Sequence, residues 1–105
     1  MSSEYVPDIG HIIWIDFDPQ APALILSPTS YNAKTSLAVM CAITSNVKGY
    51  PFEVLIEGVP KIHGTVPADH VKSLDWRVRN ARFKAVVAPI LLEQVRLRPG
   101  ALLGF

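Results

Sequence analysis

The sequence predicts a small, mainly β domain, built as a barrel or a sandwich with short helices. Its 105 residues fit one domain, so we expect residues 1–105 to form a single unit. Half of the residues are apolar and 18% are charged, which is the composition of a folded protein. Short apolar segments alternate with turn residues at intervals of roughly 8 to 12 positions, and one helical pattern follows them.

The first half of the chain contains three expected strands. Residues 11–17 and 23–26 are apolar and are bounded by proline, aspartate, glycine and serine, so each predicts a strand. The polar segment 28–36 is expected to be a loop, in which one helical turn could form. Residues 37–44 form a continuous apolar run, which predicts a strand covered on both sides.

The second half of the chain predicts four shorter strands, at residues 52–56, 63–66, 70–74 and 81–87. Pro67 has no backbone N–H to donate, so it indicates a bulge or an edge position between two of them.

The one convincing helix is expected to begin at Pro89, because proline suits the first helical turn. Leu91 and Val95 lie four positions apart and give this helix an apolar side. Pro99 and Gly100 predict that the helix ends or kinks there.

The net charge of +1 conceals an uneven distribution of charge. Residues 1–33 contain four acids and no Lys or Arg, whereas residues 72–84 contain five basic residues and one acid. The basic residues are Lys72, Arg77, Arg79, Arg82 and Lys84. Such a cluster is either a local phosphate-binding face or an ordinary solvated turn.

The single cysteine, Cys41, cannot form an internal disulfide, which agrees with a reducing compartment. No apolar stretch approaches the roughly 20 residues that a membrane span needs, and no signal peptide is apparent at the N-terminus. We therefore expect a cytoplasmic protein without a membrane partner.

The sequence lacks most of the motifs that hold a cofactor or a metal ion. It has no zinc-type Cys/His spacing, no glycine-rich phosphate loop and no G-x-S-x-G turn. We expect no cofactor and no metal. These exclusions leave binding, or a metal-free reaction carried out by Thr, Ser, His, Arg and Lys. RNA cleavage is such a reaction, because the 2′-hydroxyl can attack its own phosphate.

Four motifs in order resemble the MazF/PemK family of toxin ribonucleases over residues 5–80. The first motif is Tyr5-Val6-Pro7-Asp8-Ile9-Gly10 with Ile12-Ile13-Trp14-Ile15-Asp16-Phe17-Asp18-Pro19, and the second is Pro22-Ala23-Leu24-Ile25-Leu26-Ser27-Pro28 with Tyr31-Asn32 and Lys34-Thr35. The third is Thr44-Ser45 with Lys48-Gly49-Tyr50-Pro51-Phe52-Glu53-Val54. The fourth is Ala68-Asp69-His70-Val71-Lys72-Ser73-Leu74-Asp75-Trp76-Arg77. The resemblance implies an SH3-like β-barrel, the CcdB/PemK-like toxin fold, and a homodimer. It also implies metal-independent cleavage of single-stranded RNA at short sequences, and neutralisation by an antitoxin protein whose tail lies over the RNA groove.

Site residues follow from the resemblance, position by position. Thr44 falls on the catalytic threonine of the family, where it would hydrogen-bond the scissile phosphate. The expected RNA-binding residues are Phe17, Asn32, Ser45, Lys48, Asp69, His70 and Lys72. Phe17 either stacks on a base or packs in the core, and Asn32 either reads a base edge or caps a turn. At His70 the family often carries glutamine, and a histidine there could also move a proton.

The largest departure from the family lies between Ala21 and Pro22. There the family has a flexible, glycine-rich loop that ends in its principal catalytic arginine, whereas this sequence has no arginine before Arg77. Three explanations are open: the loop is missing from the sequence only, it was deleted by engineering, or a natural member lost it. If the sequence is complete, we expect very weak RNA cleavage, because an arginine aimed at a developing phosphate charge is commonly worth several kcal/mol.

Two other functions remain alternatives to the endoribonuclease toxin. One is a catalytically impaired, loop-deleted module that still binds antitoxin or RNA. The other is a toxin that poisons DNA gyrase, since the same fold serves such toxins. The motifs at Thr44-Ser45 and Lys48-Gly49-Tyr50 favour the nuclease.

Overall fold

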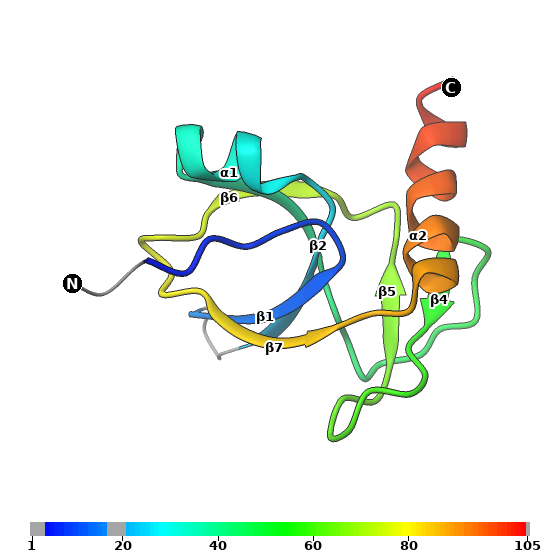
Figure 1. Cartoon of the computed structure of the whole chain (residues 1–105). Helices are drawn as coiled ribbons and strands as arrows, with labels where there is room; N and C mark the ends of the chain where they lie inside the picture. The colour runs from blue at the N-terminus through cyan, green and yellow to red at the C-terminus, as the bar shows by residue number, and fades with distance from the viewer. Residues whose placement is uncertain (1–3, 17–20, 105) are drawn as a thin grey trace.

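A computed structural model describes residues 4–16 and 21–104 of the chain. Within these residues it contains seven strands and two helices. Figure 1 shows how they are arranged. In chain order they are β1 (His11–Ile15), β2 (Ala21–Ile25), α1 (Thr29–Thr35), β3 (Leu37–Ala42), β4 (Glu53–Leu55), β5 (Thr65–Pro67), β6 (Lys72–Asp75), β7 (Arg82–Val86) and α2 (Pro89–Leu102). Neither helix is long and apolar enough to cross a membrane, as judged over the described part of the chain.

The strands pair in two antiparallel sheets. The larger sheet has the order β6-β3-β2-β1-β7, and the smaller sheet pairs β4 with β5. One isolated bridge between Thr44 and Thr65 links the end of the larger sheet to the smaller one. The predicted mainly β class is confirmed. The described strands nevertheless form two linked sheets and do not close into one hydrogen-bonded barrel.

The central strands of the larger sheet are buried on both faces, as the continuous apolar runs predict. One core cluster takes Ile12 from β1, Leu24 from β2 and Cys41 from β3, and it extends to the smaller sheet and α2. The alternate residues of the same strands point to the opposite face, because side chains alternate along a strand. There they form a second cluster with Trp76: Ile13, Ile15, Ala23, Ile25, Ala38 and Met40.

The structure corrects the prediction for segment 28–36 and confirms the one for Pro67. The polar segment 28–36 contains α1, a helix of seven residues rather than one turn. Asn32 within it is buried and hydrogen-bonded to distant residues, so tertiary contacts stabilise a helix that the local sequence does not favour. Pro67 lies in β5, which pairs only with β4 among the described strands, so its predicted edge position is confirmed.

Helix α2 begins at Pro89 and buries Leu91 and Val95, as predicted. It does not end at Pro99 but continues to Leu102. A proline at this position removes only one N–H from the helical ladder, and the next turn closes normally, with the Leu103 N–H donating to the Pro99 carbonyl at 2.9 Å. In Figure 1, α2 stands beside β4 and β5, far from α1.

Candidate functional site

A hollow of about 260 Å³ opens beside β3 and the loop that follows it. Its floor is apolar and its rim carries the polar and charged side chains. The lining residues are Ile15, Ala23, Met40, Ala42, Thr44, Asn46, Lys48, Tyr50, Glu53, Pro67, His70, Lys72 and Leu74. We call this hollow the groove. It brings together four of the predicted site residues: Thr44, Lys48, His70 and Lys72.

One side of the groove follows a simple alternation in the sequence. Met40 and Ala42 lie on the same face of β3, and Thr44 continues that face beyond the end of the strand. The alternation then persists through Asn46, Lys48 and Tyr50, all of which line the groove. The strand therefore supplies a small apolar floor, and its extension supplies hydroxyl, amide and ammonium groups at the rim.

Thr44 is held by two backbone hydrogen bonds with Thr65. The Thr44 N–H donates to the Thr65 carbonyl at 2.9 Å, and the Thr65 N–H donates back at 2.8 Å. Gly64 makes this close approach feasible, because a Cβ at Gly64 would lie 2.1 Å from the Thr44 carbonyl oxygen. The Thr44 Oγ1 accepts the Asn46 N–H at 3.1 Å. Its hydroxyl proton therefore remains available for donation to a ligand in the groove.

Glu53 organises the loop that carries Lys48. Its carboxylate accepts the backbone N–H groups of Lys48 at 2.9 Å and Gly49 at 2.6 Å, and the Thr65 hydroxyl at 3.3 Å. The Lys48 N–H, above all, lowers the pKa of the Glu53 carboxyl, so this residue is ionised at neutral pH. Its carboxylate is thus engaged within the protein, although it lines the groove.

Lys48 and Lys72 give the groove its positive charge. Both side chains are exposed, and neither ammonium has a hydrogen-bond or ion-pair partner among the described residues. Lys72 begins β6 opposite Met40 of β3, which places it across the floor from the Thr44 side. His70 precedes this strand, and its Nε2 lies 3.7 Å from the Asp69 carboxylate. Two unpaired ammonium groups beside a hydroxyl donor suit a phosphate group.

No arginine lines the groove among the residues that the structure describes. The strand β2 contains Ala21 and Pro22 as consecutive residues, which lie opposite Ile15 and Trp14 of β1. Among the described residues, the groove therefore lacks the arginine that the resemblance implies.

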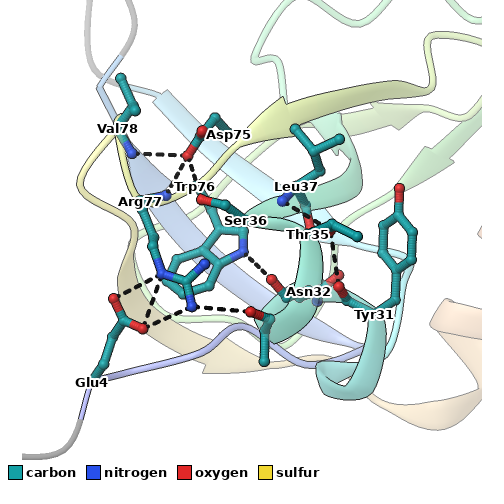
Figure 2. A network of polar contacts seen from close by, with 11 residues as sticks. Glu4, Tyr31, Asn32, Thr35, Ser36, Leu37, Asp75, Trp76, Arg77 and Val78 are labelled. Atoms are coloured by element: carbon teal, nitrogen blue, oxygen red, sulfur yellow. Dashed lines mark hydrogen bonds and ion pairs between the residues drawn. The ribbon is translucent and has the colours of Figure 1, made fainter.

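Asn32 does not lie at the groove. Its side chain is fully buried, where it accepts the Ser27 hydroxyl at 2.6 Å and donates to the carbonyls of Pro7 and Ser27 at 2.8 and 2.9 Å. Figure 2 shows that the Trp76 indole N–H also donates to the Asn32 carbonyl, at 3.0 Å. The expected role of Asn32 in reading a base does not fit this position, because its side chain is buried and both amide N–H bonds are used within the protein. Its other interpretation, a structural role at a turn, is supported.

The basic segment 72–84 is not one continuous phosphate-binding face. Arg77 forms an ion pair with Glu4 at 2.9 Å and stacks on Trp76, and Figure 2 shows it between the two. Arg82 pairs with Asp16 at 3.2 Å. Acidic residues from the first third of the chain therefore pair with two arginines of the basic segment. Of that segment, Lys72 lines the groove.

The remaining predicted residues lie as follows. Ser45 is exposed next to Thr44 but is not a lining residue of the groove, and Asp69 is half-buried behind His70. Phe17 lies outside the described residues. No group of three or more His, Cys, Asp or Glu side chains in the described ranges could hold a metal ion.

The groove also contains residues to which the sequence interpretation gave no role: Asn46, Tyr50 and Glu53. The alternation of polar residues from Thr44 to Tyr50 would have indicated the first two. Glu53 comes from β4, and only the folded loop shows that it receives the N–H groups of that loop.

Known proteins match this chain over most of its length. A family model described as PemK-like, MazF-like toxin of type II toxin-antitoxin system matches residues 8–98. Two relatives are the endoribonuclease toxin MazF of Escherichia coli (strain K12) and the endoribonuclease MazF of Escherichia coli O157:H7. Each is 43% identical over 112 residues, which cover 99% of this chain and 100% of the relative. Because that alignment is longer than the 105-residue chain, part of each relative has no counterpart here.

Solved structures match over nearly the whole chain as well. A MazE–MazF crystal structure (Form-II) from Deinococcus radiodurans is 47% identical, with a TM-score of 0.92, and the match covers 97% of this chain and 99% of that chain. A MazF crystal structure (Form-I) from the same organism is 44% identical, with a TM-score of 0.91 and coverage of 97% and 100%. The chain therefore belongs to the family of PemK-like, MazF-like toxins of type II toxin–antitoxin systems.

Proposed function

We propose that this protein is a metal-independent endoribonuclease toxin that cleaves single-stranded RNA in the groove. The observation that carries this proposal is the meeting of Thr44, Lys48, His70 and Lys72 around one hollow with a small apolar floor. Relatives that align over the whole chain are named endoribonucleases. A groove with unpaired ammonium groups and a hydroxyl donor suits the phosphate of an RNA strand.

The groups in the groove match the needs of phosphate transesterification. Lys48 and Lys72 attract the backbone, and the Thr44 hydroxyl donates to a non-bridging oxygen of the scissile phosphate. The RNA 2′-hydroxyl then attacks the phosphorus, which gives a 2′,3′-cyclic phosphate and a 5′-hydroxyl. Ser45 and Asp69 contact the bases or the sugar at the edge of the groove in this proposal. No step needs a metal ion, so cleavage should persist in EDTA.

The cleavage rate should be low, because no arginine supplements the two lysines at the groove. A direct test replaces the connection between β1 and β2 with the corresponding segment of the E. coli relative. If that segment supplies the missing arginine, the rate on a single-stranded oligomer should rise by about 10²- to 10³-fold. The matched control is the same graft with its arginine replaced by alanine. Equal rates for the two grafts, or a native chain as fast as the E. coli relative, would contradict this account.

A binding module without catalysis is the second candidate, and the same missing arginine favours it. The two candidates differ in one result. A protein that binds RNA or antitoxin in the groove but yields no cyclic phosphate product after prolonged incubation is a binding module. Inhibition of DNA gyrase without RNA cleavage would instead favour the gyrase-poisoning toxin.

The expected protein partner is a cognate antitoxin, since a relative was solved as a MazE–MazF complex. We propose that an acidic antitoxin segment and RNA compete for Lys48 and Lys72, because both ligands are anions. Antitoxin that leaves the RNA affinity unchanged would contradict this proposal.

We further propose a cytoplasmic homodimer. Helix α2 exposes Ile90, Leu97 and Leu102, which is apolar surface that a second copy could cover. Light scattering of the purified protein tests the dimer, with a monomer at micromolar concentration as the contradicting result.

A further inference from the structure

Three side chains at one edge of the groove form a chain of polar contacts. The Tyr50 hydroxyl donates to the Asp69 Oδ1 at 2.7 Å, and the Asp69 Oδ2 faces the His70 Nε2 at 3.7 Å. Tyr50 and His70 line the groove, whereas Asp69 lies behind them. The side chain of His70 is 62% exposed and that of Asp69 is 26% exposed, so the imidazole is open to the groove and the carboxylate is partly shielded.

This arrangement sets the proton positions on the imidazole. A carboxylate that faces Nε2 favours the tautomer with the proton on Nε2. The Nδ1 atom then carries a lone pair and can accept a proton. The Tyr50 hydroxyl fixes the carboxylate from the other side. Its bond to Asp69 raises the pKa of Tyr50 to about 12, so the hydroxyl remains a donor at neutral pH.

The other ionisable groups of the groove are poor candidates for a base. Lys48 and Lys72 carry ammonium groups, which donate hydrogen bonds and have no lone pair to accept a proton. The Glu53 carboxylate already accepts the N–H groups of Lys48 and Gly49 and the Thr65 hydroxyl. Among the described lining residues, His70 combines exposure to the groove with a ring nitrogen, Nδ1, that has no hydrogen-bond partner among them.

We propose that His70 is the general base of RNA cleavage in this protein, and that Asp69, held by Tyr50, is its positioning residue. His70 takes the proton of the RNA 2′-hydroxyl. The 2′-oxygen forms a bond to phosphorus, the bond from phosphorus to the 5′-oxygen breaks, and the leaving 5′-oxygen takes a proton from water. The hydroxide formed from that water takes the proton from His70, which restores the base. The products are a 2′,3′-cyclic phosphate and a 5′-hydroxyl, and nothing is oxidised or reduced. The proposal rests on the endoribonuclease function proposed above.

The test compares pH–rate profiles of the full chain and its variants between pH 5 and 9 on one single-stranded oligomer. The wild-type rate should rise with pH and then level off, as expected when a general base must be unprotonated to act. His70→Gln keeps a hydrogen-bonding side chain but cannot take the proton. It should lower kcat by about 10²-fold or more and abolish the rise. Asp69→Asn should lower kcat less than His70→Gln does and should keep the rise of the rate with pH.

Two controls separate catalysis from binding and folding. His63→Gln changes an exposed histidine that does not line the groove, and it should leave the profile unchanged. Binding to a 2′-O-methyl oligomer, which cannot be cleaved, should be within about threefold of wild type for His70→Gln, a change worth less than 1 kcal/mol. Added imidazole should partly restore the rate of His70→Gly but not that of Thr44→Val.

The outcomes are distinguishable. A His70→Gln variant with the wild-type rate and pH profile overturns the proposal and leaves the endoribonuclease function intact. If the whole loss in His70→Gln is a loss of affinity for the 2′-O-methyl oligomer, then His70 only binds RNA. This result also overturns the proposal. Wild-type protein that gives no cyclic phosphate product overturns both the base and the proposed function.

Discussion

The groove and the network around Asn32 and Trp76 both contain polar and charged side chains. The network pairs these groups within the protein, whereas the groove leaves several of them without a partner in the described part of the chain. In the network, buried polar atoms are paired with one another, and Arg77 covers the indole of Trp76 and bonds to Glu4 (Figure 2). At the groove, the ammonium groups of Lys48 and Lys72 are exposed and have no partner among the described residues.

This difference teaches how to separate structural from functional polar residues in this chain. A polar side chain whose donors and acceptors are all used inside the protein stabilises the fold. A polar side chain held in place by its backbone, with its own donors free, is available to a ligand. Thr44 is a residue of the second kind. Thr65 fixes its backbone, and its hydroxyl proton has no acceptor among the described residues.

Thr44→Val should produce the largest effect that distinguishes the two regions. Valine has nearly the same shape but cannot donate to the phosphate, so kcat should fall by about 10²-fold. The free energy of unfolding should change by less than about 1 kcal/mol, because the backbone bonds to Thr65 remain. Cleavage assays and urea unfolding check both values.

The matched control is Thr35→Val in the network region, where the Thr35 hydroxyl donates to the Tyr31 carbonyl. It should leave cleavage unchanged. Equal losses of activity for the two variants would show that the groove has no special role for its threonine.

Asn32→Ala should destabilise the protein without altering the site. Removal of this amide strips the Pro7 and Ser27 carbonyls of their buried donors, so unfolding should become about 3 kcal/mol easier. RNA affinity per folded molecule should not change. Urea unfolding and fluorescence polarisation with a single-stranded oligomer measure the two quantities. Asn46→Ala, an exposed asparagine at the groove, serves as the stability control and should cost less than about 0.5 kcal/mol.

Much of the fold could be predicted, because strand alternation and the spacing of Leu91 and Val95 are local patterns. The helix α1 could not be predicted in this way. Its stability depends on Asn32 reaching Pro7 in one direction and Trp76 in the other, and no local window of sequence contains all three. The passage of α2 through Pro99 is similar, since the cost of one missing N–H is small near the end of a packed helix.

The candidate site was predictable where motif and alternation agree. Thr44 and Lys48 lie on one alternating run, and His70 and Lys72 lie on another, so both pairs reach the groove. Asn32 was ambiguous because an asparagine next to a turn can read a base or bond the backbone, and only burial distinguishes the two. The pairing of Arg77 with Glu4 joins residues 73 positions apart, which a charge count along the chain cannot show.

Lys48→Ala and Lys72→Ala should each weaken RNA binding several-fold. Each lost phosphate contact should also reduce the slope of log affinity against log salt by about 0.7, the value for single strands. Binding titrations between low and moderate salt measure this slope. Lys34→Ala, in α1 beside the network, should leave it unchanged. If Lys34→Ala reduced the salt slope as much as Lys48→Ala and Lys72→Ala do, RNA would also contact the network region.

The smallest effect concerns acid stability. The Val78 N–H, followed by the Ser36 hydroxyl, lowers the pKa of the Asp75 carboxyl in the folded protein. A lowered folded pKa contributes stability above the unfolded value, about 3.9 for Asp, and this stability is lost as the pH falls through the folded pKa. Asp75→Asn should therefore reduce the loss of unfolding free energy between pH 5 and 3.

Urea unfolding at several pH values measures this effect of Asp75. Glu57→Gln is the control, because Glu57 is exposed and makes no hydrogen bond or ion pair among the described residues. An acid sensitivity that is the same in Asp75→Asn and in wild type would contradict the role of Asp75.

The most direct test of the account is an NMR titration of the isotope-labelled protein with a 2′-O-methyl single-stranded oligomer. We expect saturable shifts of the amides of Thr44, Lys48 and Lys72 and of the His70 ring. The indole N–H of Trp76, which is bonded to the Asn32 carbonyl, should not move. Shifts centred on Trp76 and its neighbours, with the groove unaffected, would show that RNA binds elsewhere and would contradict the central claim.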